Sequence, residues 1–390
     1  MRQLEGAWIS PARLNRSRIR LQRTGFFEDV SIETPPVPGQ RDQVDVNISV
    51  KERGSGNVTA SMGYGQGQGV ILAASVNENN FMGTGQRVSA EVNNSDVNTI
   101  YSFSFTNPYY TLDGISRGYQ LFVRETTADA AGIAPYVANV YGGFVNYGFP
   151  VSEYKTARVG FGLDSTSISL TSSSPPSYET YIERFGSNFD TIKISGSWSH
   201  DTRNRAFFPD KGGLLNLSGE MALPIEGIGF VKSTIKQQNY FGLPKDWTIA
   251  VTGEVSFGRG FGDISQLPFY ENYFAGGGQS VRGFVDNSLG PVEGGRALGG
   301  DRRITGTVDL LMPLPFDGSG KSFRISVFTD VGNVYAAGRP IQLDRLRSSA
   351  GVSAVWITPL GALRFSQAWP ITHFPGDQIQ NLQFSIGAPF

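Results

Sequence analysis

Few residues in this sequence could carry enzyme chemistry. The 390-residue chain has no cysteine, so it offers no thiolate, no disulfide and no cysteine ligand for a metal. Its two histidines are His200 and His373. Asp201 follows His200, but neighbours on a strand point to opposite faces and cannot form a dyad. Neither histidine has a nucleophilic serine or a ligand cluster in a matching pattern, so we expect no enzyme activity, no cofactor and no metal.

The most distinctive candidate is an arginine in a glycine-rich segment. Arg282 belongs to the motif Val281-Arg282-Gly283-Phe284, which follows the glycines at 276–278. A guanidinium is a planar fork of donors that can bind a carboxylate through two hydrogen bonds. A glycine-rich backbone can fold into an enclosed space, where this guanidinium would require a carboxylate partner. The alternative is an ordinary loop arginine in contact with solvent.

Two aspartates are candidate partners because of the pattern around them. In residues 304–312 most apolar side chains occupy even positions, so Asp309 faces the other way. In residues 324–331 the apolar side chains at 325, 327 and 331 occupy odd positions, so Asp330 faces away from them. Both carboxylates would then point to the polar side of a sheet.

The elements that must position these residues are β-strands. From about Asn57 onward, apolar and polar residues alternate in segment after segment, with turn residues between them. Tyr101, Phe103 and Phe105, for example, alternate with serine and threonine. We count about sixteen such segments, which begin near Asn57, Gly69, Gln86, Asn98, Arg117, Val137, Lys155, Asn188, Gly213, Val231, Trp247, Asp301, Arg324, Ser349, Gly361 and Leu382.

One apolar and one polar face on each strand predicts an all-β fold: a sixteen-stranded antiparallel transmembrane β-barrel over residues 54–390. A closed barrel leaves no backbone edge in hydrocarbon, and bacterial barrels have an even number of strands. The alternative is a soluble β-sandwich or propeller, whose apolar faces would pack on each other. Aromatic residues near strand ends, such as Tyr109, Phe207 and Phe269, favour the barrel because they suit membrane interfaces.

The composition agrees with a barrel. Hydrophobic residues make up 39% of the chain, and charged or polar residues interrupt every apolar stretch. The sequence therefore lacks the run of about 18 apolar residues that a membrane-spanning helix needs. The 33 basic and 34 acidic residues nearly cancel, so overall charge gives no reason to expect a nucleic-acid partner. Charged residues on the polar strand faces, such as Lys193 and Glu254, are expected to be solvated in the lumen.

Residues 1–53 follow a different pattern. Ser10 and Pro11 mark the start of a helix, and Thr24-Gly25 marks its end. Residues 30–34 and 44–50 then have the pattern of two strands around a proline-rich turn. This order predicts the back half of a small α+β unit whose first strand is missing. Because no signal peptide is visible and a barrel must be exported, we expect the N-terminus to be a cut point in a longer precursor.

The connections between strands differ in length. If residues 1–53 lie in the periplasm, the first strand runs outward and the long connections lie outside the cell. Those connections are residues 171–187, 259–300, 333–348 and 368–379, whereas turns such as 242–246 are short. This asymmetry is typical of bacterial outer-membrane barrels. The motif around Arg282 therefore belongs to a long extracellular loop, residues 259–300.

The first and last strands must pair to close the barrel, and both look weak. The last strand alternates well, but a glycine, which lowers strand stability, and Pro389, which cannot donate a ladder bond, interrupt it. The first strand is polar and flanked by glycines. We expect this seam to be the weakest closure, and we expect cysteines at Ser61 and Ser385 to seal it. The seam residues are Asn57, Ser61, Gly63, Leu382, Phe384, Ile386, Gly387 and Phe390.

Over essentially its whole length the chain resembles the BamA family of outer-membrane protein assembly factors. The most specific match is residues 267–284, LPFYENYFAGGGQSVRGF, with residues 287–291 after them, which resemble the family's sixth extracellular loop. Two departures are a short stretch between Pro291 and Asp301 and the absence of most of the periplasmic POTRA region. Further matches are residues 25–27, 42–46 and 50–53, similar to the end of the last POTRA domain, and residues 107–109, 201–209, 359–361 and the terminal phenylalanine.

The resemblance implies a function and a set of partners. It implies folding and insertion of client β-barrels into the bacterial outer membrane, through a lateral gate at the seam. The implied partners are nascent β-barrel proteins, lipoproteins of the assembly machinery, and outer-membrane lipid and lipopolysaccharide. It also implies that Asp309 and Asp330 anchor Arg282. An autotransporter-assembly factor or a two-partner secretion transporter, which share the loop motif, stays an alternative, as does a passive porin, which would not need Arg282.

Overall fold

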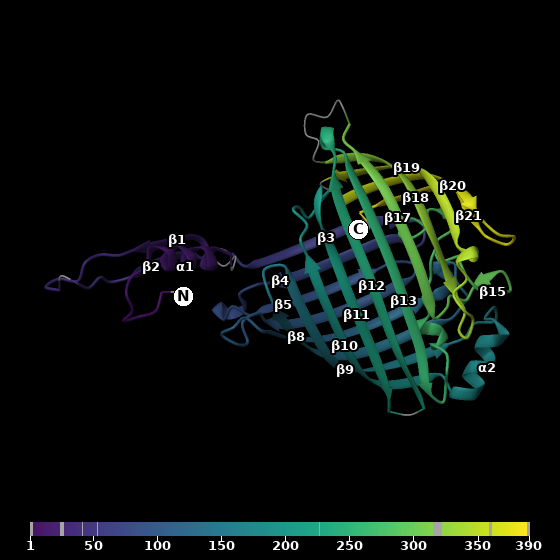
Figure 1. Ribbon diagram of the computed structural model, residues 1–390. Coiled ribbons are helices and arrows are strands. Elements are labelled where there is room, and N and C mark those ends of the chain that lie inside the picture. Colours follow the sequence, from purple (N-terminus) through teal and green to yellow (C-terminus); the bar gives the residue numbers. More distant parts are fainter. Residues whose placement is uncertain are drawn as a thin grey trace.

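The N-terminal part of the chain is a small α+β unit at one end of a barrel (Figure 1). The computed structural model describes residues 3–23, 27–40, 42–52, 54–225, 227–314, 322–358 and 361–387. Helix α1 (Pro11–Arg23) begins after Ser10, whose carbonyl accepts the first helical hydrogen bond from Leu14. Strands β1 (Phe27–Glu33) and β2 (Asn47–Glu52) pair antiparallel. The predicted helix end at Thr24-Gly25 lies outside the described residues.

The rest of the described chain forms a closed antiparallel barrel of sixteen strands, as predicted. Successive barrel strands pair with each other, and β22 pairs back with β3. The strands are β3 (Gly56–Gly65), β4 (Gly69–Glu78), β5 (Arg87–Asn94), β6 (Asn98–Asn107), β7 (Ser116–Thr127), β8 (Val137–Pro150), β9 (Lys155–Ser169), β10 (Asn188–Asp201), β11 (Lys211–Pro224), β12 (Ile228–Gly242), β13 (Thr248–Gly262), β17 (Arg302–Met312), β18 (Phe323–Tyr335), β19 (Arg347–Thr358), β20 (Gly361–Thr372) and β22 (Leu382–Ile386).

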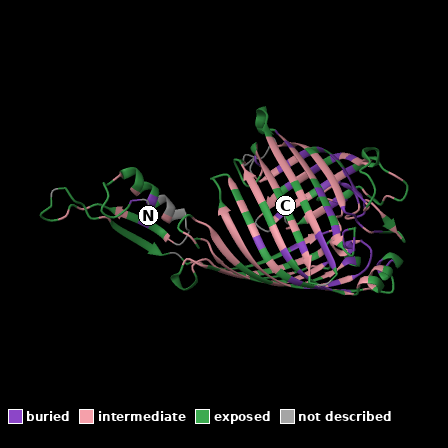
Figure 2. Ribbon diagram, turned by 60° about the horizontal axis from the view of Figure 1, so that its bottom comes forward, coloured by how far each residue is buried: buried purple, intermediate pink, exposed green. Residues whose placement is uncertain are grey.

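Alternation along the strands decides which side chains face lipid. Outward residues such as Leu72, Val76 and Val327 are about half exposed, whereas inward polar residues such as Thr191 and Ser366 are buried. Figure 2 shows buried residues concentrated in the half of the barrel nearer the long loops. An apolar exterior and a polar interior are the reverse of a sandwich or propeller, whose apolar faces pack together, so those alternatives are wrong.

The end of the barrel opposite the N-terminal unit carries the long loops (Figure 1). Helix α2 (Pro176–Phe185) lies in the connection between β9 and β10, where only a loop was expected. Pro176 occupies its first turn and Gly186 follows its end, as helix boundaries favour. Tyr178 of this helix stacks on Phe269, with ring centroids 3.9 Å apart. Phe269 is therefore buried in a cluster of aromatic rings over the lumen, and its expected place at a membrane interface is wrong.

The loop that contains Arg282 starts later than predicted, because β13 continues to Gly262. We call residues 263–301 loop 6. It holds a 3₁₀ turn, η4 (Phe269–Glu271), and three two-residue strands, β14 (Gly283–Phe284), β15 (Val292–Glu293) and β16 (Arg296–Ala297). The short strand β21 (Ile379–Gln380), just before the last barrel strand, pairs with β14. Loop 6 therefore joins a sheet with the segment that leads into the seam.

The described helices are short. Neither α1 nor α2, nor any other helix in the described part of the chain, is both long and apolar enough to cross a membrane.

Candidate functional site

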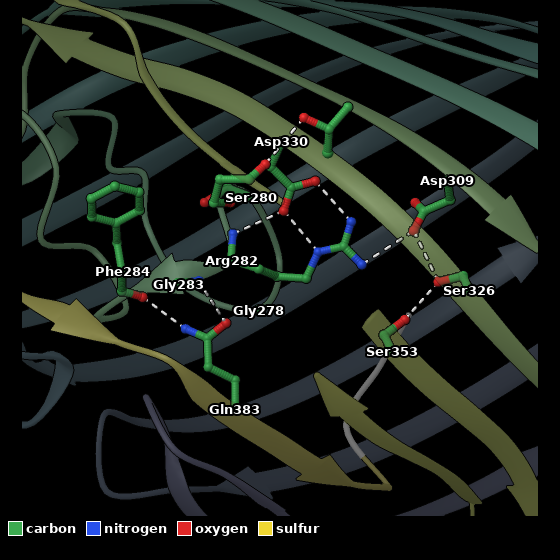
Figure 3. A network of polar contacts seen from close by, with 12 residues as sticks. Gly278, Ser280, Arg282, Gly283, Phe284, Asp309, Ser326, Asp330, Ser353 and Gln383 are labelled. Atoms are coloured by element: carbon green, nitrogen blue, oxygen red, sulfur yellow. Dashed lines mark hydrogen bonds and ion pairs between the residues drawn. The ribbon is translucent and has the colours of Figure 1, made fainter. Parts of the chain in front are cut away.

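Arg282 of loop 6 binds two aspartates on the barrel wall (Figure 3). Its Nε and Nη2 donate to Oδ2 and Oδ1 of Asp330, each at 2.7 Å, and its backbone N–H donates to Oδ2 at 2.9 Å. Its Nη1 donates to Oδ1 of Asp309 at 3.2 Å. Asp309 lies on β17 and Asp330 on β18. We call these three residues the arginine anchor, because they tie the loop to two neighbouring strands.

The arginine anchor is enclosed. Arg282 is 8% exposed and Asp330 1% exposed. The guanidinium carbon lies 3.3 Å from the ring centroid of Phe328, which covers one face of the fork. Asp309 also accepts a hydrogen bond from Ser326 at 3.2 Å, and Ser326 contacts Ser353 at 2.7 Å. The Asp309 carboxylate is therefore also fixed by the barrel wall. Because Arg282 is buried and paired, the alternative of a solvated loop arginine is wrong.

Glycines allow the motif to reach the wall. Gly283 has φ of +90°, a conformation that side chains with a Cβ rarely adopt. A Cβ on Gly332, two residues after Asp330, would lie 2.7 Å from Cγ2 of Val281. Val281 and Phe284 are fully buried, and both belong to an apolar cluster with Leu289 and other residues. All four motif residues are therefore used: the arginine binds, the glycine turns, and the two apolar side chains pack.

A second group of charges, which sequence reasoning missed, fixes the beginning of loop 6. Glu271 accepts from Lys232 at 2.8 Å and lies 3.5 Å from Lys193. Lys193 also pairs with Asp164 at 2.8 Å and with Glu220 at 3.3 Å. We call Lys193, Lys232 and Glu271 the lysine anchor. Lys193 is 8% exposed, so the expectation that it is solvated in the lumen is wrong.

The environment of Glu271 favours its charged form. Burial by itself raises the pKa of Glu271, but the two lysines outweigh burial and lower it to about 2.

Glu254, the other wall charge expected to be solvated, pairs with Arg303, whose Nη1 donates to the carbonyl of Phe274 at 3.1 Å. The available signal was that Lys193 and Lys232 lie on the inward faces of β10 and β12, the two strands on either side of β11, while a glutamate lies at the start of the loop motif.

The seam between β3 and β22 is the shortest junction in the described barrel. Two residue pairs join the strands, Ser385 with Gly65 and Ile386 with Tyr64. On its other side, β3 pairs with β4 at ten positions. The first seven residues of β3, from Gly56 to Met62, are exposed. Most of β3 therefore has no partner on the seam side within the described residues.

Two glycines end the pairing at the seam. Gly387 has φ of +62°, which turns the chain out of strand conformation directly after Ile386. A Cβ on Gly63 would lie 2.8 Å from the Ile386 carbonyl oxygen, so a glycine is needed where the chain turns past β3. The Gly387 N–H donates to the carbonyl of Ala362 on β20 at 2.9 Å. The end of the last strand therefore follows β20 rather than β3.

The predicted seam residues other than these two glycines divide into three groups. Leu382, Phe384 and Ile386 face outward, and Phe384 stacks on Tyr64 of β3 at 5.3 Å between ring centroids. Asn57 and Ser61 lie in the exposed length of β3, so Ser61 is not opposite Ser385 and cysteines there would not seal the seam. Phe390 lies outside the described residues.

Comparisons with known proteins identify relatives over the whole chain. The model of the Omp85 superfamily domain matches residues 80–390, and a POTRA model, described as a surface antigen variable number repeat, matches residues 1–53. The outer membrane protein assembly factor BamA of Neisseria meningitidis is 30% identical over 429 residues, which cover 100% of this chain and 54% of that protein. BamA of Nitratidesulfovibrio vulgaris is 27% identical over 399 residues, which cover 100% of this chain and 48% of that protein.

A solved structure is similar throughout. The crystal structure of Haemophilus ducreyi BamA lacking POTRA domains 1–3 superposes with a TM-score of 0.89 at 30% identity, covering 99% of this chain and 80% of that one. The chain spans about half the length of the curated relatives it matches.

Proposed function

Because the chain belongs to the Omp85 superfamily, and within it to the BamA outer-membrane assembly factors, we propose that it folds client β-barrels and inserts them into the outer membrane through the seam between β3 and β22. The protein is an outer-membrane β-barrel. We take residues 54–390 as the membrane domain and residues 1–53 as the end of a periplasmic POTRA domain. Neither role requires an enzyme reaction or a cofactor.

The observation that carries the proposal is the exposed edge of β3. Two pairs hold β3 to β22, against ten to β4. A strand edge with free N–H and C=O groups is a template to which another strand can add. A client strand that paired with residues 56–63 would satisfy these groups. The rest of the client could then follow by forming hairpin after hairpin.

The dimensions of the last strand support opening at this place. Within the described residues β22 has five residues. A strand that crosses the hydrocarbon needs about 9–11 residues. Such a short strand favours a locally thin bilayer beside the seam, because matching the bilayer to the strand costs little per ångström. A thin bilayer lowers the barrier for a polar, partly folded client.

The energy for insertion would come from the client. Burial of apolar surface contributes about 25 cal/mol per Å², and each ladder bond contributes about 1 kcal/mol in water and more in hydrocarbon. The protein would act by lowering the barrier, so no nucleotide is required. The partners under this proposal are nascent β-barrel proteins, the assembly-machinery lipoproteins, and outer-membrane lipid with lipopolysaccharide. A passive porin is disfavoured, because two anchors hold loop 6 inside the lumen.

The proposal can be tested by sealing the seam. Ser385 lies opposite Gly65, and a Cβ on Gly65 has an open space with its nearest neighbour at 3.9 Å. Gly65→Cys with Ser385→Cys should therefore form a disulfide across the seam. In cells depleted of the wild-type copy, we expect the oxidised variant to stop assembling clients and reductant to restore assembly.

A matched disulfide controls for the chemistry. Thr59 and Ser75 are opposite each other on β3 and β4, away from the seam. Thr59→Cys with Ser75→Cys adds the same bond without sealing anything, and we expect client assembly to continue. Normal client assembly by a fully oxidised Gly65–Ser385 variant would show that the seam is not the route.

A further inference from the structure

The segment that follows Arg282 in loop 6 touches both sides of the seam. Gly283 and Phe284 contact the segment around the last strand, and Asp286 contacts the turn between β3 and β4. The arginine anchor fixes the start of this segment to β17 and β18. The segment therefore connects the strong wall of the barrel to its weakest junction.

The last strand is attached to loop 6 through Gln383. This side chain is 5% exposed, its Oε1 accepts from Gly283 N–H at 3.3 Å, and its Nε2 donates to the Phe284 carbonyl at 2.7 Å (Figure 3). Just before the strand, β21 pairs with β14, and Val285 N–H donates to the carbonyl of Gln378 at 3.0 Å. Loop 6 thus binds both the last strand and its approach.

The first hairpin is attached through Asp286. Its carboxylate lies against Gly67, in the β3–β4 turn, and faces the backbone N–H groups of Gly67 and of Gly278 in loop 6. A Cβ on Gly67 would lie 2.7 Å from the carboxylate carbon, so the turn lies directly against this side chain. Burial raises the pKa of Asp286, although both N–H groups act to lower it. The contact is therefore largely withdrawn from solvent.

We propose that residues 283–286 of loop 6 form a clasp that holds the seam closed from the lumen, with Gln383 attached on one side and Asp286 on the other. The inference rests on the proposed function, since it describes how the proposed gate is kept shut. Apart from the clasp, the polar links across the seam in the described residues are the two ladder pairs and a bond from Phe384 N–H to Gln66 Oε1 at 3.2 Å. The β3–β4 hairpin has fewer bonds to loop 6 than β22 has, so its attachment should release first. Asp286, which makes that attachment, is therefore the positioning residue that limits opening.

The test measures seam opening without any client. Hydrogen–deuterium exchange of the amides at Tyr64, Phe384 and Ile386, which point across the seam, reports the open population, because these amides exchange when the seam opens locally. The full chain in lipid nanodiscs is compared with Asp286→Ala. Loss of the carboxylate that faces the Gly67 N–H should make exchange at the seam about tenfold faster. Exchange in the β11–β12 ladder should not change.

Two further variants separate a clasp from a general loss of structure. Glu293→Ala removes a carboxylate from the same loop, where it contacts Ser177 away from the seam, and should leave seam exchange unchanged. Gly67→Ala adds a Cβ against the carboxylate and should speed seam exchange. Seam exchange in the double variant, Asp286→Ala with Gly67→Ala, should be no faster than in Asp286→Ala alone. Without the Asp286 carboxylate, the added Cβ at position 67 no longer overlaps anything there.

The outcomes are distinct from those for the proposed function. Faster seam exchange in Asp286→Ala with unchanged exchange in Glu293→Ala supports the clasp. Unchanged seam exchange in Asp286→Ala overturns it, whatever the variant does to client assembly. Folding of each variant is checked by its heat-dependent mobility on a gel. Client assembly by the oxidised Gly65–Ser385 variant tests the gate itself and does not enter this comparison.

Discussion

Loop 6 meets the barrel wall in two regions that differ in strength. At β17 and β18, eleven residue pairs join the strands, and Arg282 places three hydrogen bonds on Asp330 and one on Asp309. At the seam, two residue pairs join β3 to β22. If the seam is a gate, loop 6 needs one fixed attachment so that it stays in the lumen when the seam opens. The difference in strength makes the arginine anchor the fixed base of the clasp and the seam the side that can open.

The largest effect is expected when the arginine anchor is broken. Arg282→Ala would leave Asp330 as a buried charge without its main partner, which costs about 3–5 kcal/mol. Loop 6 should then leave the wall, and limited proteolysis should cut at Gly276–Gly278. Arg296→Ala is the control, because Arg296 lies in the same loop and pairs with an exposed aspartate, Asp129. Equal protection of both variants would contradict the anchor.

A smaller effect, which depends on pH, is expected at the lysine anchor. The pKa of Glu271, about 2, lies below the ordinary carboxyl value of 4.5. The charged Glu271 therefore stabilises the folded state fully above pH 4.5. That stabilisation should be lost progressively as the pH falls from 4.5 towards 2. Glu271→Gln should lower the melting temperature at pH 6 and reduce its fall between pH 5 and pH 3. Circular dichroism melts of both proteins measure this difference, and parallel pH profiles would contradict it.

The smallest effect is expected on the lipid side of the seam. Phe384 stacks between Tyr64 and Phe365, with centroid distances of 5.3 Å and 6.1 Å. Such aromatic pairs contribute about 0.5–1.5 kcal/mol each beyond burial. Phe384→Ala should speed hydrogen exchange of the seam amides by less than Asp286→Ala does. Phe257→Ala removes an outward ring from β13 and should not affect the seam; equal acceleration by both variants would argue against the stack.

The barrel was predictable from the sequence because alternation is a local signal. The largest error in a strand start is three residues, at β12, which begins at Ile228 rather than Val231. Alternation also placed Asp309 and Asp330 on the inward face. This reduced the candidate partners of Arg282 to the few carboxylates that point into the lumen. Helix α2 was missed because its ten residues begin at the second of two prolines, after a run of serines, where loop composition hides a short helix.

The contacts between distant segments could not be predicted in this way. The stagger of β22 against β3 depends on how the whole sheet closes, so the sequence did not reveal that Ser385 faces Gly65 rather than Ser61. The path of loop 6 decides that Glu271 meets Lys232 and that Asp286 meets Gly67. An inward lysine or a loop aspartate lies in the same local sequence pattern whether its side chain is solvated or paired. Local sequence therefore cannot distinguish the solvated state from the paired one.

If client strands add to the free edge of β3, as proposed, site-specific photo-crosslinking from that edge should capture them. A photoreactive residue is placed in turn at Val58, Ala60 and Met62, outward positions on β3, with Met221 on β11 as the control. With a client stalled during assembly, we predict crosslinks to one client strand, whose crosslinked position moves by two residues at each step along β3. Crosslinks no stronger than those from Met221, or without that step, would contradict the account.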